Sequence, residues 1–203
     1  DMEDYLFTNL LAGMCGSFMA QTSDEICKRK GVTREETDEF AAMSHARTAA
    51  SIDNGVWEQE IVSVNDVTFK DEDHVVRGST AESLAGLRTA FGPESLVTAG
   101  NASQISDGAA ACLVMSREKA NELDLECLAT ITNYCAVGVP SEDVMSAPIP
   151  AVHKLWKMQG RNGQQDYDLY EHNEAFASAC LGVMQGLGLK HEKLNVHGGA
   201  VGM

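Results

Sequence analysis

The chain has 203 residues, 44% of them hydrophobic, which is enough for a buried core in one sizeable domain or two small ones. Its net charge of −15 argues against nonspecific binding to nucleic acid or anionic membranes, so an anionic ligand would need a local basic site. Six cysteines without a CxxC pair, and no apolar run of bilayer length, favour a cytoplasmic protein in which all six cysteines are small buried hydrophobes.

The first half of the chain is expected to be mainly helical. Residues 19–30 form a helix with a basic last turn, and Gly31 is a common stop signal for such a helix. Thr33 and Glu36 make a capping box that opens a second helix, which runs to about residue 54. Alternating apolar and polar residues then predict half-exposed strands between 56 and 76, and a short helix over 81–87 follows them.

Strands and helices are expected to alternate through the second half, each strand an apolar run and several helices opened by a capping residue or a proline. The expected strands are 109–115, 128–137, 167–171 and one near Asn195. The expected helices are 117–123 after Ser116, about 151–159 after the Pro-Ile-Pro turn, and about 174–186. This alternation predicts an α/β layer sandwich, preceded by a mixed α+β insertion.

Three motifs of small and polar residues stand in the second half. They are TAGNAS at 98–103 with DGAAA at 107–111, NEAFA at 173–177, and NVHGGA at 195–200. In this order and at this spacing they resemble thiolases, enzymes that make or break carbon–carbon bonds between acyl thioesters of coenzyme A. The resemblance spans nearly the whole chain. It implies an incomplete thiolase-like layered α/β fold, with an insertion (loop) domain over 1–105 and part of the α/β core over 106–203.

The resemblance implies two catalytic residues in this chain. In thiolases the asparagine of the NEAFA motif, here Asn173, holds a water that stabilises negative charge on a thioester oxygen. An asparagine between a strand and a helix is also a common N-cap, and both roles can coexist. His197 takes a position where thiolases carry asparagine or histidine, so it acts near the oxyanion site or serves as a turn histidine satisfied by backbone.

Residues that bind the coenzyme A part of the substrate also follow from the resemblance. Ser103 and the backbone near Ala99 are expected to line the pantetheine tunnel, because small residues let a backbone approach a slender ligand. Ser83 and Arg77 lie in the segment that resembles the adenine and phosphate contacts of the family. For Arg77 the alternative is a solvated surface charge.

Four apolar residues are expected along the acyl and pantetheine channel: Met19, Phe18, Met145 and Phe176. Ordinary packing is the alternative for each of them, since methionine and phenylalanine fill cores in most proteins. The family often carries a histidine where Phe18 aligns, which is a departure from its pattern. Met145 and the insertion resemble acetoacetyl-CoA thiolases and favour short acyl groups.

The chain is expected to lack the parts of a thiolase that do the covalent chemistry. Met14-Cys15-Gly16-Ser17 matches the nucleophile signature superficially, but Cys15 directly precedes a helical hairpin that resembles the insertion domain. We therefore expect the nucleophilic cysteine, the histidine of a Gly-His-Pro motif and the second cysteine to lie outside these 203 residues. The fragment alone would then be inactive.

The resemblance implies an acyltransferase that condenses two acyl-CoAs reversibly or cleaves a 3-ketoacyl-CoA by thiolysis. It also implies acyl-CoA substrates, no covalently bound cofactor or metal, a homodimer or homotetramer, and an exposed apolar edge on this fragment. A noncatalytic acyl-CoA-binding protein and a related condensing enzyme such as a ketoacyl synthase are the alternatives. NEAF at 173–176 favours thiolase over the synthase.

Overall fold

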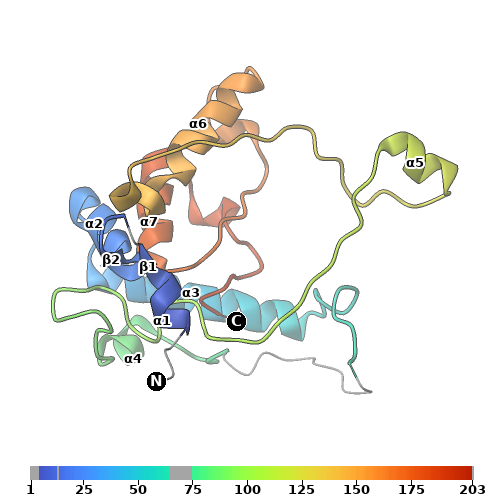
Figure 1. Cartoon of the computed structure of the whole chain (residues 1–203). Helices are drawn as coiled ribbons and strands as arrows, with labels where there is room; N and C mark the ends of the chain where they lie inside the picture. The colour runs from blue at the N-terminus through green and yellow to red at the C-terminus, as the bar shows by residue number, and fades with distance from the viewer. Residues whose placement is uncertain (1–4, 13, 65–74, 203) are drawn as a thin grey trace.

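The structure is a computed structural model that describes residues 5–12, 14–64 and 75–202. Helices α2, α3, α6 and α7 make up the body of the molecule, and α5 stands away from it at the end of a long arm (Figure 1). The α-helices are α1 (Tyr5–Leu10), α2 (Met19–Lys30), α3 (Arg34–Asp53), α4 (Ala81–Ala85), α5 (Arg117–Glu122), α6 (Pro148–Met158) and α7 (Ala177–Leu187). The 3-10 helices are η1 (Ser141–Ser146), η2 (Gln164–Asp166) and η3 (His191–Lys193), and β1 (Leu11–Ala12) pairs antiparallel with β2 (Ser17–Phe18).

Helices α2 and α3 confirm the helical hairpin predicted for the first half. Gly31 ends α2 with a φ of +70°, in the left-handed region that glycine adopts without a steric cost. Thr33 caps α3 by accepting the backbone N–H of Glu36, whose carboxylate accepts the Thr33 N–H at 2.7 Å in return. Short-range capping signals therefore set these helix ends.

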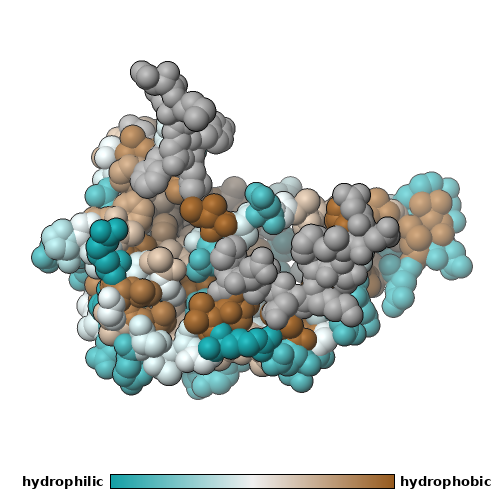
Figure 2. Space-filling model, turned by 90° about the horizontal axis from the view of Figure 1, so that it is seen from below, coloured by the Kyte–Doolittle hydropathy of each residue, from teal (hydrophilic) through white to brown (hydrophobic). Residues whose placement is uncertain are grey.

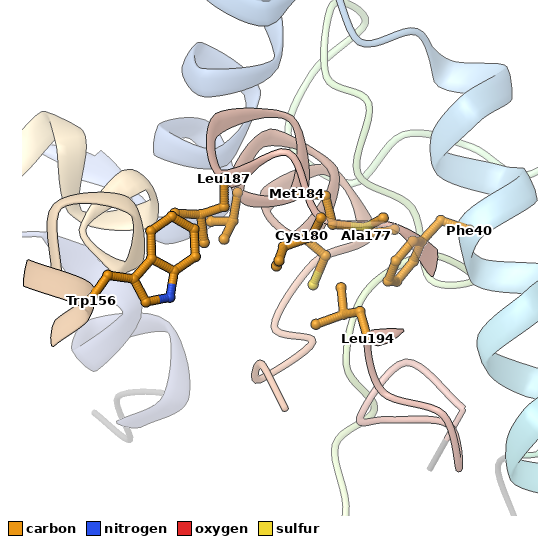
Figure 3. Packing of buried hydrophobic residues seen from close by; sticks show 9 residues of the cluster. Phe40, Trp156, Ala177, Cys180, Met184, Leu187 and Leu194 are labelled. Atoms are coloured by element: carbon orange, nitrogen blue, oxygen red, sulfur yellow. The ribbon is translucent and has the colours of Figure 1, made fainter. Parts of the chain in front are cut away.

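The main core lies around α7, which packs against α2, α3 and α6. Phe40 of α3 and Trp156 of α6 lie on two sides of it, and Leu194 closes the cluster from the C-terminal segment (Figure 3). Gly182 of α7 lets α2 come close, since a Cβ there would lie 2.7 Å from the Ile26 side chain. The packing of these helices joins the N-terminal helical hairpin to the C-terminal part of the chain.

Two of the predicted helices begin at other residues than expected. Helix α6 starts at Pro148, because a proline in the first turn needs no N–H partner and its φ is preset for a helix. Helix α7 starts at Ala177 rather than near residue 174, because Phe176 is extended and forms a β-bridge with Ala102. The pairing of two distant segments therefore delays the helix.

The predicted strands 109–115 and 128–137 are wrong for the structure as described. Both segments are extended, but neither is paired with a strand, and they form the two sides of the arm that carries α5 (Figure 1). Leu128 is 96% exposed, and other apolar side chains of the arm are largely exposed as well. They are Ile105, Leu113, Val114, Ile131 and Tyr134. Apolar residues are visible on the arm at the right edge of Figure 2, which confirms the expected exposed apolar edge.

The arm also corrects the expectation that all six cysteines are buried. Cys112 and Cys127 are exposed because they lie on the unpaired segments, while Cys27 and Cys180 are buried in the body. Tyr170 and Leu194 form a single parallel bridge where the last two strands were expected. The strands expected between 56 and 76 fall partly outside the described residues, and Val64 forms an isolated bridge within the described part.

In the part of the chain that the structure describes, no helix combines the length and the apolar character needed to cross a membrane.

Candidate functional site

The three motifs that carry the thiolase resemblance lie side by side in the structure. The Ser103 N–H donates to the Ala175 carbonyl at 2.9 Å, which joins the first motif to the second. The Gln104 N–H donates to the Ala200 carbonyl at 3.4 Å, which joins the first to the third. Segments far apart in the sequence are therefore joined by hydrogen bonds.

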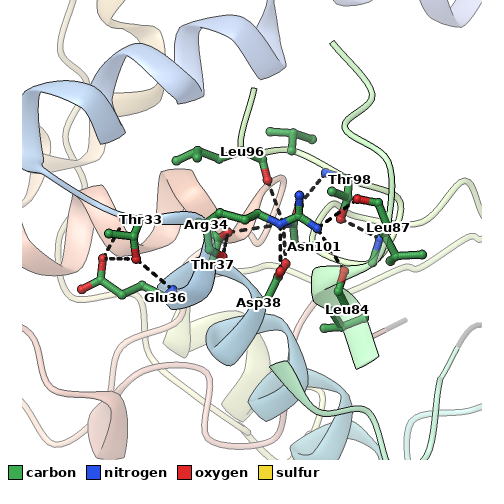
Figure 4. Close-up of polar contacts among 12 residues, drawn as sticks. Thr33, Arg34, Glu36, Thr37, Asp38, Leu84, Leu87, Leu96, Thr98 and Asn101 are labelled. Carbon is green, nitrogen blue, oxygen red and sulfur yellow. Dashed lines mark hydrogen bonds and ion pairs between the residues drawn. The ribbon is translucent and has the colours of Figure 1, made fainter. Parts of the chain in front are cut away.

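The first motif is anchored on α3 through Asn101. Its Oδ1 accepts the Thr98 N–H at 2.8 Å, and its Nδ2 donates to Asp38 Oδ1 at 2.9 Å and to the Leu96 carbonyl at 2.9 Å (Figure 4). Asp38 also pairs with Arg34, whose Nε lies 2.8 Å from Asp38 Oδ2. Asn101 and Asp38 are each 1% exposed, so the loop is held by a buried polar network whose partners are satisfied.

A polar face of α3 holds the glycine-rich third motif. Its residues are spaced three or four apart, which places them on one side of the helix: Ser44, Arg47, Thr48 and Ser51. Arg47 donates from Nη1 to the Leu194 carbonyl at 2.7 Å and from Nη2 to the His191 carbonyl at 2.8 Å. Ser51 Oγ donates to the His197 carbonyl at 3.0 Å. Helix α3 therefore determines the path of the C-terminal segment.

Glycines allow this segment to touch the helix. Gly198 has a φ of +89°, and a Cβ there would meet Thr48 Oγ1 and lie 2.7 Å from the Thr48 backbone nitrogen. At Gly199 a Cβ would meet the Glu174 carboxylate and lie 2.5 Å from its Oε2. The motif is thus glycine-rich because it passes between a helix backbone and a buried carboxylate.

Glu174 of the second motif lies at the centre of this contact. Its Oε2 accepts from Ser44 Oγ at 2.6 Å and from the Val201 N–H at 3.2 Å, and its Oε1 accepts from Asn195 Nδ2 at 2.8 Å. The residue is 2% exposed, and three neutral donors satisfy its carboxylate. One side chain therefore links α3, the NEAFA motif and the glycine-rich segment.

Asn173 stands next to this carboxylate and is exposed. Its side chain has no hydrogen-bond partner within the described residues, which leaves its amide available to a ligand or a water. The alternative that it is the N-cap of the following helix is wrong, because α7 begins at Ala177 with Phe176 as its N-cap.

His197 is also exposed and lies on the turn that α3 holds. Its ring meets Trp57 edge-on at a centroid distance of 5.9 Å, and its Nδ1 lies 3.4 Å from Ser51 Oγ. The backbone contact with Ser51 agrees with the turn role considered for this histidine, and the exposed ring is open to a second role.

The expected coenzyme A-binding residues fall into two groups. Ser103 and Ala99 are exposed on the first motif, which the bond from the Ser103 N–H to the Ala175 carbonyl joins to the second motif. Ser83 and Arg77 lie outside the three motifs. The Ser83 hydroxyl accepts the N–H of Thr80, the N-cap residue of α4, and donates to the Thr80 carbonyl, and Arg77 pairs with Asp53 at 2.9 Å. Both members of this ion pair are exposed.

The expected channel residues are partly buried. Met145 packs against the cluster of Ile26, Cys27 and Val32, in keeping with the packing alternative. The Phe18 ring packs against the Phe91 ring at a tilt of 47° and a centroid distance of 5.6 Å, and Phe18 precedes Met19, the first residue of α2. Phe176 pairs with the first motif through its bridge to Ala102 and is half-buried.

The two buried cysteines are poor nucleophiles. Burial raises the pKa of the Cys27 thiol to about 12, and this thiol donates to the Ser178 carbonyl at 3.2 Å. Burial also raises the pKa of Cys180 well above its ordinary value, although its sulfur lies 3.5 Å from His172 Nδ1. The pKa of His172 is itself lowered by burial, so the pair is a neutral thiol beside a neutral imidazole. Cys15 lies half-buried in the turn between β1 and β2.

The sequence analysis missed the buried residues that hold the three motifs in place. Glu174 and Asn195 stood inside the recognised motifs, and the helical spacing of the polar face on α3 was visible in the sequence. The sequence did not show which segment covers the polar face of α3, and a buried polar face has the same residue pattern as a solvent-exposed one.

Within the described residues, no three or more His, Cys, Asp or Glu side chains gather where they could hold a metal ion.

Comparison with known proteins places the chain in one family. The family model for the thiolase N-terminal domain matches residues 1–118, and the model for the thiolase C-terminal domain matches residues 125–203. An acetyl-CoA acetyltransferase from Escherichia coli (strain K12) is 41% identical over 200 residues, which cover 96% of this chain and 50% of that protein. A 3-ketoacyl-CoA thiolase from Bacillus subtilis is 40% identical over 91% of this chain and 51% of its own length.

Solved structures agree with this assignment. The chain is similar to human mitochondrial 3-ketoacyl-CoA thiolase in complex with CoA, with a TM-score of 0.93 and 33% identity over 100% of this chain and 51% of that one. It is also similar to the Bacillus anthracis acetyl-CoA acetyltransferase, with a TM-score of 0.90 and 36% identity over 100% of this chain and 52% of that one. The chain spans about half the length of these relatives, and its mainly helical structure agrees with an incomplete α/β fold of their kind. The chain therefore belongs to the thiolase family.

Proposed function

We propose that this chain is the part of an acyl-CoA acetyltransferase that binds the coenzyme A thioester and stabilises negative charge on its carbonyl oxygen. The complete enzyme condenses two acyl-CoAs reversibly or cleaves a 3-ketoacyl-CoA by thiolysis. One observation carries the proposal: the three motifs are bonded to one another and to α3, and Asn173 is exposed on the second of them.

Asn173 serves this chemistry because its amide is exposed while its neighbours are fixed. An amide N–H, or a water held by it, donates to the thioester oxygen as the carbonyl carbon becomes tetrahedral or enolic. A donor placed before the reaction lowers the barrier by about 3 kcal/mol. His197 lies on the adjoining turn and supports the same oxyanion region.

Ser103 and Ala99 provide a narrow exposed surface for the pantetheine arm, because neither side chain is larger than a hydroxymethyl group. Ser83 and Arg77 lie where the phosphates and adenine bind, and Arg77 is a local cation on an acidic protein. Met19, Phe18, Phe176 and Met145 line the acyl end, which favours short acyl groups.

The nucleophilic cysteine is expected from a segment outside these 203 residues, because Cys15 directly precedes the hairpin that resembles the insertion domain and burial raises the pKa of both Cys27 and Cys180. The 203-residue chain alone therefore binds coenzyme A but does not turn over substrate. The complete protein is a cytoplasmic homodimer or homotetramer that uses acyl-CoA as substrate and needs no metal or bound cofactor. The boundary between an insertion domain over residues 1–105 and part of the α/β core over residues 106–203 is also a prediction.

The test is Asn173→Ala in a full-length subunit that carries this chain. Loss of the oxyanion donor is expected to lower kcat for thiolysis of acetoacetyl-CoA about a hundredfold. Asn162→Ala is the matched control, because Asn162 is an exposed asparagine on the turn after α6, and its kcat is expected to be unchanged. A kcat for Asn173→Ala within about threefold of the parent would show that this amide does not act in the reaction.

The alternative function is a noncatalytic acyl-CoA-binding protein. Calorimetry with coenzyme A and a thiolysis assay on the full-length subunit separate the two functions. Binding without turnover would support the alternative.

A further inference from the structure

The side chain of Asn195 holds both residues that flank Asn173. Its Oδ1 accepts the His172 N–H at 2.8 Å, and its Nδ2 donates to the His172 carbonyl at 2.8 Å and to Glu174 Oε1 at 2.8 Å. The three bonds use one acceptor and both amide hydrogens of Asn195, which is 2% exposed. The backbone before Asn173 and the carboxylate after it are thereby tied to the same amide.

Asn195 is itself fixed in the fold. Its N–H donates to the Tyr170 carbonyl at 3.0 Å, and Arg47 Nη1 lies 3.3 Å from its carbonyl oxygen. Its φ of +46° lies in the left-handed region, which asparagine tolerates better than most residues. The Gly198 N–H donates to the Asn195 carbonyl at 3.0 Å and so begins the turn that carries His197.

Glu174 extends this link to α3 and to the end of the glycine-rich segment. Its second oxygen accepts from Ser44 Oγ and from the Val201 N–H. Asn173 has no side-chain partner of its own within the described residues, so its direction depends on these flanking bonds. The same bonds set where Asn173 lies relative to the turn at His197.

We propose that Asn195 and Glu174 form a positioning pair that orients Asn173 toward the thioester oxygen, and that this pair determines turnover rather than substrate affinity. The proposal rests on the proposed function, because it concerns the same amide. Neither residue touches substrate. Both act through the backbone and the side chains on either side of Asn173.

The donor and acceptor pattern makes the pair intolerant of isosteric change. In Glu174→Gln the amide oxygen can face Ser44 and Val201, but the NH2 group then meets the NH2 group of Asn195. Asn195 cannot turn over to relieve this, because both its oxygen and its nitrogen are bound to His172. In Asn195→Asp a carboxylate oxygen instead faces the carboxylate of Glu174 and the carbonyl of His172.

The double variant, which combines Glu174→Gln with Asn195→Asp, reverses the bond between the two side chains. The introduced glutamine NH2 donates to the introduced aspartate oxygen, and the glutamine oxygen still accepts from Ser44 and Val201. One conflict remains, between the aspartate and the His172 carbonyl. The kcat of the double variant is therefore expected to be higher than the value obtained by multiplying the fold-reductions of the two single variants.

The experiment measures kcat and KM for thiolysis of acetoacetyl-CoA in full-length subunits that carry Glu174→Gln, Asn195→Asp or both. Each single substitution is expected to lower kcat about a hundredfold, as a misplaced catalytic group does, with KM changed less than about threefold. The double variant is expected to recover kcat at least about tenfold above the product of the two effects. Leu187→Ala removes core volume at the far end of α7 and is the control for lost stability, with kcat per folded subunit unchanged.

A normal kcat for Glu174→Gln overturns the proposal, and so do single effects that simply multiply in the double variant. If Asn195→Asp does not fold, Ser44→Ala replaces it, since it removes one donor to Glu174. Its kcat is expected to fall about tenfold at constant KM. An unchanged kcat for Ser44→Ala also overturns the proposal.

Failure of the proposed function gives a different result. A folded parent subunit without thiolysis activity would refute the function, and hydrogen exchange of the 203-residue chain then tests the pair alone. Glu174→Ala, which removes the acceptor of the Val201 N–H, is expected to speed exchange of the Val201 amide at least about tenfold, while the Leu189 amide, bonded to Met184, is unaffected. Equal exchange of the Val201 amide in parent and variant would show that the carboxylate does not hold the segment.

Discussion

Gly198→Ala tests whether the glycine-rich segment is built to touch α3. The substitution meets two costs: a φ of +89° that an alanine resists, and a Cβ placed 2.7 Å from the backbone nitrogen and 2.9 Å from the Cα of Thr48. The left-handed conformation costs an alanine about 1–2 kcal/mol. Overpacking against a helix backbone, which cannot rotate away as a side chain would, adds about 1–3 kcal/mol. The free energy of unfolding is therefore expected to fall by about 2–5 kcal/mol.

Gly31→Ala is the matched control. Gly31 has a similar φ of +70°, but nothing lies within 4 Å of a Cβ added there, so only the conformational cost applies. Urea denaturation followed by circular dichroism measures both variants. With a slope of about 2 kcal/mol per molar urea, the midpoint is expected to fall by about 0.5–1 M for Gly31→Ala and about 1–2.5 M for Gly198→Ala. Equal midpoints would refute the contact between Gly198 and α3.

Three further predictions follow from the buried polar groups and thiols. Asp38→Asn places an NH2 group against either Arg34 or the Asn101 network; since Arg34 is 24% exposed, unfolding by urea should show a loss near the lower bound for broken buried pairs, about 3 kcal/mol. Burial lowers the pKa of His45 below its ordinary value, so the unfolded state takes up the proton first and stability falls as pH drops below about 6.5; His45→Gln should flatten this dependence in melts between pH 5 and 7, and an unchanged slope would contradict it. Iodoacetamide at pH 8 should label the exposed Cys112 at least about a hundredfold faster than the buried Cys27, whose pKa is about 12; comparable rates by peptide mass spectrometry would show that the body opens readily.

The sequence predicted the helices whose ends are written in neighbouring residues. The capping box of Thr33 and Glu36, the stop at Gly31 and the cap at Ser116 depend on contacts within four residues, and all three are present. The strands over 109–115 and 128–137 were wrong because a strand exists only beside another strand, and no partner runs along them in the part of the chain that is described. An apolar run indicates that a segment can form a strand, but it does not show which other strand pairs with it.

The family and the positions of its motifs could be inferred from order and spacing alone, because those motifs are local patterns of residue types. Their convergence on α3, the central place of Glu174 and the three bonds of Asn195 came only from the tertiary structure. Each of these contacts joins residues more than twenty positions apart, and the identity of a buried donor's partner depends on how the whole chain folds.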